Sequence, residues 1–522
     1  MRFALALALA AVLLLLPDTS QAQRMTDRSG DPITVAKSPS SVVSTVQIFI
    51  ARIEALDDAG PELNAVIAYA DKADLHAVSQ TEGLLEGRTV LVKDNIETRE
   101  FPTTAGSLAL VANDTGRDAP LIARMRENGG VVLGKTNLSE WANIRSSEST
   151  SGWSAVGGLT RNPHGIDRNT CGSSSGSGAA VAAGLAWGAI GTETDGSITC
   201  PASLNGVVGF KPTVGLVSQE LIVPISASQD TAGPMTTTVA DAALLLSAIA
   251  GPDYGALGGS EEPYDFTVGL RTTSLAGVRV GVLRERCGEF APLCNIYERA
   301  LQDMRDAGAV LVEMTHDTDP AMGRDEFTVL LYEFREGLDA YLAGSPADIP
   351  VRSLADVIAF NEANADTEMR WFGQDIFVAA LQTTDRAAYE AARANSFRLA
   401  GPEGIDALLA KHDVAFLVAP TRGPAWVSDL VNGDNYRSGI GFGSFAAIAG
   451  YPHLTVPMGA IEGLPVGLSF IGTAWSDHAI LQAGAAYERA RRFSLPTPSL
   501  RRWGIATPVE ALVEPAVRSD AD

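Results

Sequence analysis

The stretch that decides the fold runs from 171 to 213 and reads CGSSSGSGAAVAAGLAWGAIGTETDGSITCPASLNGVVGFKPT. Clusters of Gly and Ser are usually typical of flexible linkers. Here they alternate with Ala- and Val-rich segments that suit a helix and a buried strand. A flexible linker does not contain apolar segments of this kind. We therefore predict that the stretch lies inside a folded domain.

The flanking segments predict an α/β fold. Residues 41–58 carry apolar side chains at helical spacing, which predicts an amphipathic helix, and a further helix is expected after Pro61. Residues 88–93 and 131–133 are predicted strands that enclose a predicted helix over 119–128, and strand, helix, strand in this order is typical of an α/β sheet.

The second half of the chain repeats the alternation of strands and helices. No linker is long enough to divide the chain, so we expect one large domain over 41–522, with a central mixed β-sheet flanked by helices and a mainly helical insertion around 325–411. The predicted strands are 277–283, 310–313, 413–419, 453–457 and 465–471, and the predicted helices are 293–307 and 477–492.

The N-terminal residues resemble a secretory signal. Arg2 precedes the apolar run FALALALAAVLLLL, and Ser20 and Ala22 place small residues at the positions that signal cleavage favours. We expect a signal peptide over 1–22, cleavage near Ala22, a loose arm over 23–40 and a periplasmic or extracellular protein. The apolar run is too short to span a membrane, and no later segment is predicted to do so.

Composition narrows the class of protein and of partner. The chain is 46% hydrophobic and 19% charged, which is typical of a globular protein, and its formal net charge is -23. A surface this acidic repels phosphates, so nucleic acid is not an expected partner. No Cys–His spacing indicates a metal, and no cofactor is predicted. Cys287 and Cys294 could pair, whereas Cys171 and Cys200 are interpreted first as buried packing residues, with a disulfide as the alternative.

Two well-known sequence motifs are matched, but the residues around each match argue against the function of the motif. GGVVLGKT at 129–136 matches a phosphate loop, but its Val131-Val132-Leu133 core is apolar and β-branched and predicts a strand. GSSSG at 172–176 matches the nucleophile elbow of α/β-hydrolases, but no buried strand precedes it.

The run from 171 to 213 resembles the amidase signature family, whose members carry a Gly-Gly-Ser-Ser run followed by a Gly-Gly-Ser-Ile segment. Ser173 and Ser197 lie 24 positions apart, as in the family, and Val92-Lys93-Asp94-Asn95 matches the family's lysine segment. The resemblance implies that Ser197 is the nucleophile, Ser173 a bridging serine on a cis peptide bond, and Lys93 the base. Further segments that resemble the family lie at 134–143, 228–235, 449–459 and 463–472, and the segment 260–410 resembles it least.

This chemistry requires a neutral lysine. A free lysine titrates near pH ~10.4, so the site must lower the pKa of Lys93, and burial acts in that direction. The non-catalytic alternatives are an exposed strand-end lysine at Lys93 and a helix N-cap at Ser173. His164 is interpreted as a loop residue that could line the cleft.

The resemblance implies an oxyanion hole made by the backbone N–H groups of Thr194, Asp195, Gly196 and Ser197. Asp195 replaces a family glycine, and we expect its side chain to point away from the oxyanion or to contact a polar substrate group. Thr199 replaces a frequent Arg, and Glu193 is expected to support the site without taking part in the chemistry.

We therefore predict an amide hydrolase that acts through an acyl-enzyme and releases ammonia or an amine. The GTETDGSITCPA segment, the Cys-Gly-Ser-Ser-Ser-Gly-Ser run and the export signal are most similar to bacterial peptide amidases, which implies amidated peptides as substrates. The alternatives are a fatty-acid or aryl amide hydrolase and an amidotransferase-type subunit. The export signal and the acidic charge disfavour the last.

Overall fold

A computed structural model gives the fold of the chain. It describes residues 23–26, 32–35, 42–70, 82–251 and 264–504, so the predicted signal peptide over 1–22 lies outside the described residues. Within the predicted arm over 23–40, strands β1 (Gln23–Thr26) and β2 (Pro32–Val35) pair antiparallel. Backbone hydrogen bonds between the two strands form this pair.

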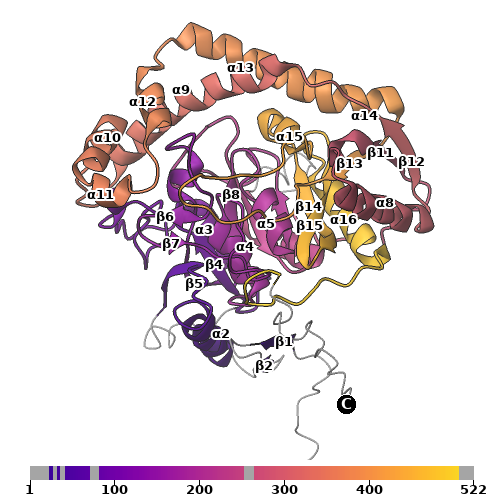
Figure 1. Ribbon diagram of the computed structural model, residues 1–522, viewed down its shortest axis with the longest axis horizontal. Helices are drawn as coiled ribbons and strands as arrows, with labels where there is room; N and C mark the ends of the chain where they lie inside the picture. The colour runs from indigo at the N-terminus through magenta and orange to yellow at the C-terminus, as the bar shows by residue number, and fades with distance from the viewer. Residues whose placement is uncertain (1–22, 27–31, 36–41, 71–81, 252–263, 505–522) are drawn as a thin grey trace, which may run out of the picture.

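An 11-stranded mixed sheet forms the centre of the molecule (Figure 1). Its order is β12-β11-β13-β15-β14-β9-β10-β8-β4-β5-β3. Strands β8, β4 and β5 run parallel to one another, as do β12, β11 and β13, and the other neighbours are antiparallel. The strands are β3 (Val66–Tyr69), β4 (Thr89–Lys93), β5 (Val131–Thr136), β8 (Gly188–Glu193), β9 (Val208–Lys211), β10 (Thr231–Thr236), β11 (Arg279–Leu283), β12 (Val310–Met314), β13 (Phe416–Pro420), β14 (His453–Ile461) and β15 (Leu464–Ile471).

Most of the predicted elements are confirmed within a few residues, including the strand that excludes a phosphate loop at 131–133. The helix expected after Pro61 is wrong over Val66–Tyr69, where the chain forms β3 at the edge of the sheet. The β-favouring side chains of Val66, Ile67 and Tyr69 pair there with β5, a partner far along the chain that local sequence does not reveal.

Helices cover both faces of the sheet. On one face lie α3 (Pro120–Glu127), α6 (Val239–Ile249), α8 (Ala291–Asp306) and α16 (Asp477–Ala490). Helix α3 contacts α6, α6 contacts α16, and α16 contacts α8. The other side carries α2 (Val42–Leu56), α4 (Ser175–Ala182), α5 (Thr199–Asn205) and α15 (Gly443–Ala449).

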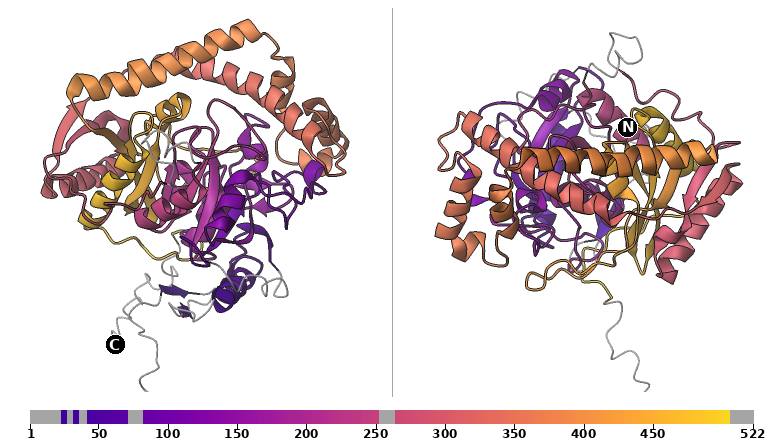
Figure 2. Two further views of the ribbon diagram at one scale, coloured as in Figure 1. Left: turned by 180° about the vertical axis from the view of Figure 1, so that it is seen from behind. Right: turned by 90° about the horizontal axis from the view of Figure 1, so that it is seen from above.

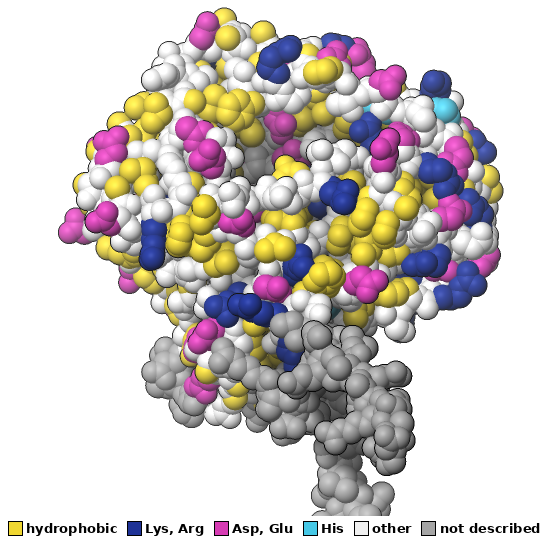
Figure 3. Space-filling model, viewed as in Figure 1, with side chains coloured by type: hydrophobic (Ala, Val, Ile, Leu, Met, Phe, Trp, Pro, Cys, Tyr) yellow, Lys and Arg dark blue, Asp and Glu magenta, His cyan; other side chains and the backbone are white. Residues whose placement is uncertain are grey.

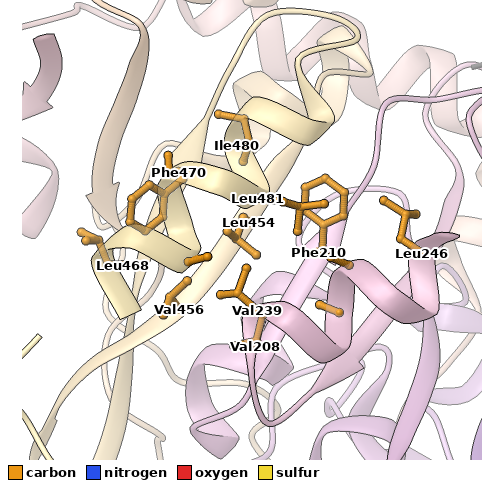
Figure 4. Packing of buried hydrophobic residues seen from close by; sticks show 14 of the residues in the cluster. Val208, Phe210, Val239, Leu246, Leu454, Val456, Leu468, Phe470, Ile480 and Leu481 are labelled. Atoms are coloured by element: carbon orange, nitrogen blue, oxygen red, sulfur yellow. The ribbon is translucent and has the colours of Figure 1, made fainter. Parts of the chain in front are cut away.

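The main hydrophobic core lies between the sheet and the first group of helices. Figure 4 shows how side chains from β9, β14 and β15 pack against those of α6 and α16, and all of these side chains are buried. Burial of each Leu, Ile, Val or Phe contributes about 1.5–3 kcal/mol. The core therefore holds together halves of the sheet that are far apart in sequence. The labelled residues are Val208, Phe210, Val239, Leu246, Leu454, Val456, Leu468, Phe470, Ile480 and Leu481.

A helical layer occupies the segment around the predicted insertion at 325–411. Helices α9 (Pro320–Gly344) and α13 (Arg386–Ala400) pack along each other and cross above both halves of the sheet (Figures 1 and 2). Between them along the chain are α10 (Leu354–Ala363), α11 (Ala365–Glu368) and α12 (Asp375–Gln382), and a π-helical turn at Gly401–Asp406 and α14 (Ala407–His412) follow. The layer therefore covers the ends of the strands on one side of the molecule (Figures 1 and 2). Of the helices that the structure describes, none combines the length and apolar character needed to cross a bilayer.

Candidate active site

The direction of the parallel strands brings the candidate residues together. Lys93 is the last residue of β4 and Glu193 the last of β8, and these two strands are parallel neighbours. Because parallel strands in register end at the same edge of a sheet, both residues lie at one edge, where α/β proteins form their binding crevices. The loop over 194–198 continues from β8 at that edge and leads to Ser197 and α5.

Lys93 is fully buried and held by hydrogen bonds. Its Nζ lies 2.7 Å from Ser173 Oγ, 2.8 Å from Thr192 Oγ1 and 3.2 Å from the Thr192 carbonyl oxygen. Asn95 Nδ2 donates to the same Thr192 hydroxyl at 3.0 Å. A neutral amine has two N–H groups and one lone pair, so donation to the two Thr192 oxygens leaves the lone pair directed at Ser173. The alternative of an exposed strand-end lysine is therefore wrong, because β4 is flanked by β8 and β5 and Lys93 is fully buried.

Burial also sets the charge of Lys93. It lowers the pKa of this amine from 10.5 to about 7, and the nearby Asp230 and Glu193 carboxylates oppose the shift only in part. An amine with that pKa is neutral in about half of the molecules at pH 7. Lys93 can therefore both accept and return a proton near neutral pH.

Lys135, which is also fully buried, has different partners from those of Lys93. It lies in β5, and its Nζ forms an ion pair with Asp94 at 3.2 Å and donates to the Ile96 carbonyl at 2.8 Å. Within the described part of the chain, Lys93 has no ion pair of this kind. A carboxylate partner would favour the charged amine, so its lack suits a base.

Ser173 and Ser197 lie on two loops that are joined by the backbone. The N–H of Ser174 donates to the Ser197 carbonyl at 3.0 Å, and the Ser139 N–H donates to the Ser173 carbonyl at 3.0 Å. The Gly172–Ser173 peptide bond is cis. Helix α4 begins at Ser175 with Ser174 as its N-cap residue, so the N-cap interpretation of Ser173 is wrong.

The hydroxyl groups of the two serines differ in access. Ser173 is fully buried, whereas Ser197 lines the main cleft. The hydrogen bonds of the described residues include Lys93 to Ser173 but none between the two serine hydroxyls. Catalytic hydrogen bonds commonly shorten only when substrate is bound. The structure thus places the lysine and one serine in direct contact and the second serine on the adjoining loop.

Buried carboxylates hold the loop over 194–198. Glu193 Oε2 accepts hydrogen bonds from the N–H groups of Ile198 at 2.7 Å and Thr199 at 2.8 Å. Asp230 Oδ1 accepts from the Thr194 hydroxyl at 2.6 Å. Gly196 has a φ of 81°, a conformation that favours glycine. Glu193 thus supports the start of α5 from behind, while Ser197 faces the cleft.

The backbone N–H groups on this loop remain available to a ligand. Among the hydrogen bonds of the described residues, none is donated by the backbone N–H groups of the predicted oxyanion hole, which are those of Thr194, Asp195, Gly196 and Ser197. Unpaired N–H groups beside a nucleophile are suited to a developing oxyanion. The Asp195 side chain is open to the cleft and adjoins Ser444 and Arg422.

A disulfide joins the two serine-bearing segments. Cys171 precedes the Gly172–Ser173 bond, Cys200 lies in the first turn of α5, and their Cα atoms are 5.9 Å apart. The interpretation of these two residues as free packing cysteines is therefore wrong. Packing of α4 on α5 brings them within bonding range, although 29 positions separate them. Cys287 and Cys294 form a second disulfide.

A large cleft opens onto Ser197. Its volume is about 1170 Å³, and it lies between the serine loops, the loop over 142–151, the start of α9 and the segment over 421–445. The face shown in Figure 3 is hollowed below the helical layer. Charged side chains line the cleft, which is unusual for a site that receives only apolar ligands. They are Glu148, Asp195, Arg286, Asp319, Glu326, Arg422 and Asp434.

None of the histidines that the structure describes forms a hydrogen bond with Lys93, Ser173 or Ser197. His164 Nε2 lies 3.0 Å from the Asn205 carbonyl oxygen, and burial lowers the pKa of His164 to about 4. It is not among the residues that line the cleft, so that part of its interpretation is wrong. His453 does line the cleft, but its Nε2 lies 2.7 Å from Ser469 Oγ.

Sequence reasoning missed several residues of the site. Thr192, Asn95 and Asp230 adjoin the segments that carry the family resemblance, so inspection of those segments could have found them. Glu326 and Arg422 give no such signal. They reach the cleft from distant segments outside the recognisable motifs.

Comparisons with known proteins agree with the fold and the site. The family model described as Amidase matches residues 44–481. The solved structure of native peptide amidase from Stenotrophomonas maltophilia is 48% identical, with a TM-score of 0.81, and the match covers 88% of this chain and 95% of that one.

Two curated relatives show the breadth of the family. A probable amidase of Arabidopsis thaliana is 36% identical over 481 residues, which cover 87% of this chain and 88% of that protein. A glutamyl-tRNA(Gln) amidotransferase subunit of Symbiobacterium thermophilum is 33% identical over 461 residues, which cover 84% of this chain and 90% of that protein.

The fold, the cleft and these matches define an amide-hydrolysing enzyme. The chain belongs to the amidase signature family, and its structure is similar to that of a peptide amidase.

Proposed function

We propose that the enzyme hydrolyses carboxamides through a Ser-Ser-Lys mechanism, with Ser197 as nucleophile, Ser173 as proton relay and Lys93 as base. The observation that carries the proposal is the 2.7 Å contact between Lys93 Nζ and Ser173 Oγ, in a fully buried site next to the loop that presents Ser197. A serine hydroxyl is a weak nucleophile until a neighbouring base takes its proton.

The proposed steps pass the proton between these three side chains. As Ser197 Oγ bonds to the amide carbon, its proton passes to Ser173 Oγ, and the Ser173 proton passes to Lys93 Nζ. The carbonyl oxygen becomes an oxyanion, which is stabilised by the backbone N–H groups of Thr194, Asp195, Gly196 and Ser197. The protons then return along the same path to the leaving nitrogen, the C–N bond breaks, and ammonia or an amine departs from an acyl-Ser197 ester. Water attacks that ester with the same base and releases the carboxylic acid.

We propose C-terminally amidated peptides as the substrate class. The cleft is larger than one amino-acid amide requires, and charged side chains line it. The polar groups of a peptide backbone can pair with these side chains, whereas a fatty-acid chain offers them no hydrogen-bonding group. The similarity to the Stenotrophomonas maltophilia peptide amidase supports the same class.

Replacement of the nucleophile tests the mechanism. Ser197→Ala should reduce the release of ammonia from an N-acyl dipeptide amide to background. Ser149→Ala, which removes another hydroxyl from the cleft, should retain activity near that of the wild type. Turnover by Ser197→Ala above background would rule out this nucleophile. A fluorophosphonate probe should label the wild type and Ser149→Ala but not Ser197→Ala.

We further propose that the protein is exported and loses residues 1–22. The apolar run near its N-terminus and the two disulfides support this, because disulfides persist in oxidising compartments. The mass of the protein purified from the native host should correspond to a chain that begins at Gln23. A thiol assay of the denatured protein without reductant should detect no free thiol. A mass that includes residues 1–22 would contradict the proposal.

A further inference from the structure

Asp195 is placed beside the reacting atoms by the chain itself. It lies two residues before Ser197, which limits the distance between their Cα atoms to about 7 Å. Its backbone N–H belongs to the loop that faces the oxyanion, and its carboxylate is open to the cleft. The side chain is therefore next to any amide that Ser197 attacks.

The surroundings leave this carboxylate free to accept more hydrogen bonds. Burial raises the pKa of Asp195, whereas a hydrogen bond from Ser444 and the nearby Arg422 and Lys211 act in the opposite direction. In the described part of the chain, no Lys, Arg or His side chain forms an ion pair with it. A carboxylate can accept about four hydrogen bonds, so acceptor capacity remains on the cleft side.

Glu326 faces the same region from the helical layer. It lies on α9 with 9% of its surface exposed, and Gln229 Nε2 donates to its Oε1 at 3.0 Å. The same Gln229 nitrogen lies 3.5 Å from the Thr194 carbonyl oxygen, which places Glu326 against the loop that carries Asp195. No described residue donates to the second oxygen of Glu326, and this side chain lines the cleft.

The charges of these groups favour a neutral donor. Burial and the nearby Asp195 raise the pKa of Glu326 to about 8, so Glu326 is mostly protonated at pH 7. Protonated Glu326 adds no negative charge to that of the Asp195 carboxylate, and the cations Arg422 and Lys211 already act on Asp195. An ammonium group would gain little there, whereas an N–H group would form a charge-assisted hydrogen bond.

The position of that donor follows from the substrate. In a peptide amide, the N–H of the residue that bears the scissile amide is two bonds from the reacting carbon, at roughly 2.5 Å. We propose that Asp195 accepts a hydrogen bond from this N–H, with Glu326 holding the other side of the subsite, so that the enzyme selects N-acylated residues. This inference rests on the proposed function and adds a specificity-determining residue to it.

The test compares two substrates that differ in one atom. An N-acyl dipeptide amide has the N–H, and its depsipeptide analogue has an ester oxygen at that position. Loss of a hydrogen bond to a charged group typically costs about 10- to 100-fold. We expect wild-type kcat/KM for ammonia release to favour the peptide by that factor, Asp195→Ala to abolish the preference, and Asp195→Asn, which keeps an acceptor, to retain part of it.

Matched controls separate this subsite from general charge effects. Glu148 also lines the cleft and is exposed, so Glu148→Gln should leave the preference unchanged. An amino-acid amide with a free amine places an ammonium at the same position and should be a poorer substrate than its N-acyl form.

Equal turnover of peptide and depsipeptide by the wild type would overturn the proposal, as would an equal loss with both substrates in Asp195→Ala. A preference for the free amine would also overturn it. These results concern a ratio of substrates, whereas turnover by Ser197→Ala would instead overturn the nucleophile, so the two failures are distinguishable.

Discussion

Replacement of Lys93 by Met should remove activity and at the same time stabilise the fold near neutral pH. The side chains are similar in length, but methionine carries no charge into the buried site. Because the amine is fully buried, its pKa in the folded enzyme is about 7, compared with 10.5 in the unfolded chain. Between these values the unfolded chain binds more protons, so the contribution of Lys93 to stability rises with pH.

The two pKa values set the magnitude. Relative to an uncharged side chain, Lys93 lowers the free energy of unfolding by about 4 kcal/mol at pH 7 and by about 1 kcal/mol at pH 9.5. Loss of its hydrogen bonds to Thr192 and Ser173 costs Lys93→Met about 1–3 kcal/mol, and this cost is the same at both pH values. The advantage of Lys93→Met over the wild type should therefore fall by about 3 kcal/mol between pH 7 and pH 9.5.

Urea unfolding at both pH values, followed by tryptophan fluorescence, measures this difference. Lys135→Met is the matched control. Lys135 forms an ion pair with Asp94, so its loss leaves a buried carboxylate unpaired and should destabilise the enzyme by about 3–5 kcal/mol. The reasoning on Lys93 is refuted if the stability difference between Lys93→Met and the wild type does not change with pH, or if Lys93→Met still releases ammonia.

Three further outcomes follow from the site. Because only neutral Lys93 accepts a proton, kcat/KM should rise about tenfold per pH unit below pH 7 and level off above it; a flat profile from pH 5 to 8 would exclude a base with this pKa. Glu193→Gln keeps one acceptor for the two N–H groups at the start of α5, so kcat should fall about 10-fold with KM little changed; a change in KM alone would show that the carboxylate does not position the nucleophile. The double variant Cys171→Ser/Cys200→Ser removes the disulfide between the two serine-bearing segments, so kcat should fall. Its free energy of unfolding should fall by about 2–4 kcal/mol and its melting temperature by several degrees, whereas unchanged values would show that packing alone holds the two segments together.

Local patterns were sufficient for most of the elements. The apolar spacing over 41–58 predicted helix α2, and the β-branched core of 131–133 predicted β5 despite its match to a phosphate loop. These elements form wherever such side chains find an apolar surface, so periodicity identifies them. The pairing of β3 with β5 depends on a strand more than 60 positions away, and propensity after Pro61 gave no sign of it.

The sequence by itself determined the fold class, and its resemblance to the amidase signature family identified the three residues that we propose for catalysis, since each lies in a short recognisable motif. Only the tertiary structure decided the burial of Lys93, the disulfide between Cys171 and Cys200, and the approach of Glu326 to the loop of Asp195. Each depends on surfaces that meet when distant segments pack, and solvation and proximity are properties of that packing. For this reason a pKa, a cross-link or a charge-balanced subsite is settled by the folded molecule.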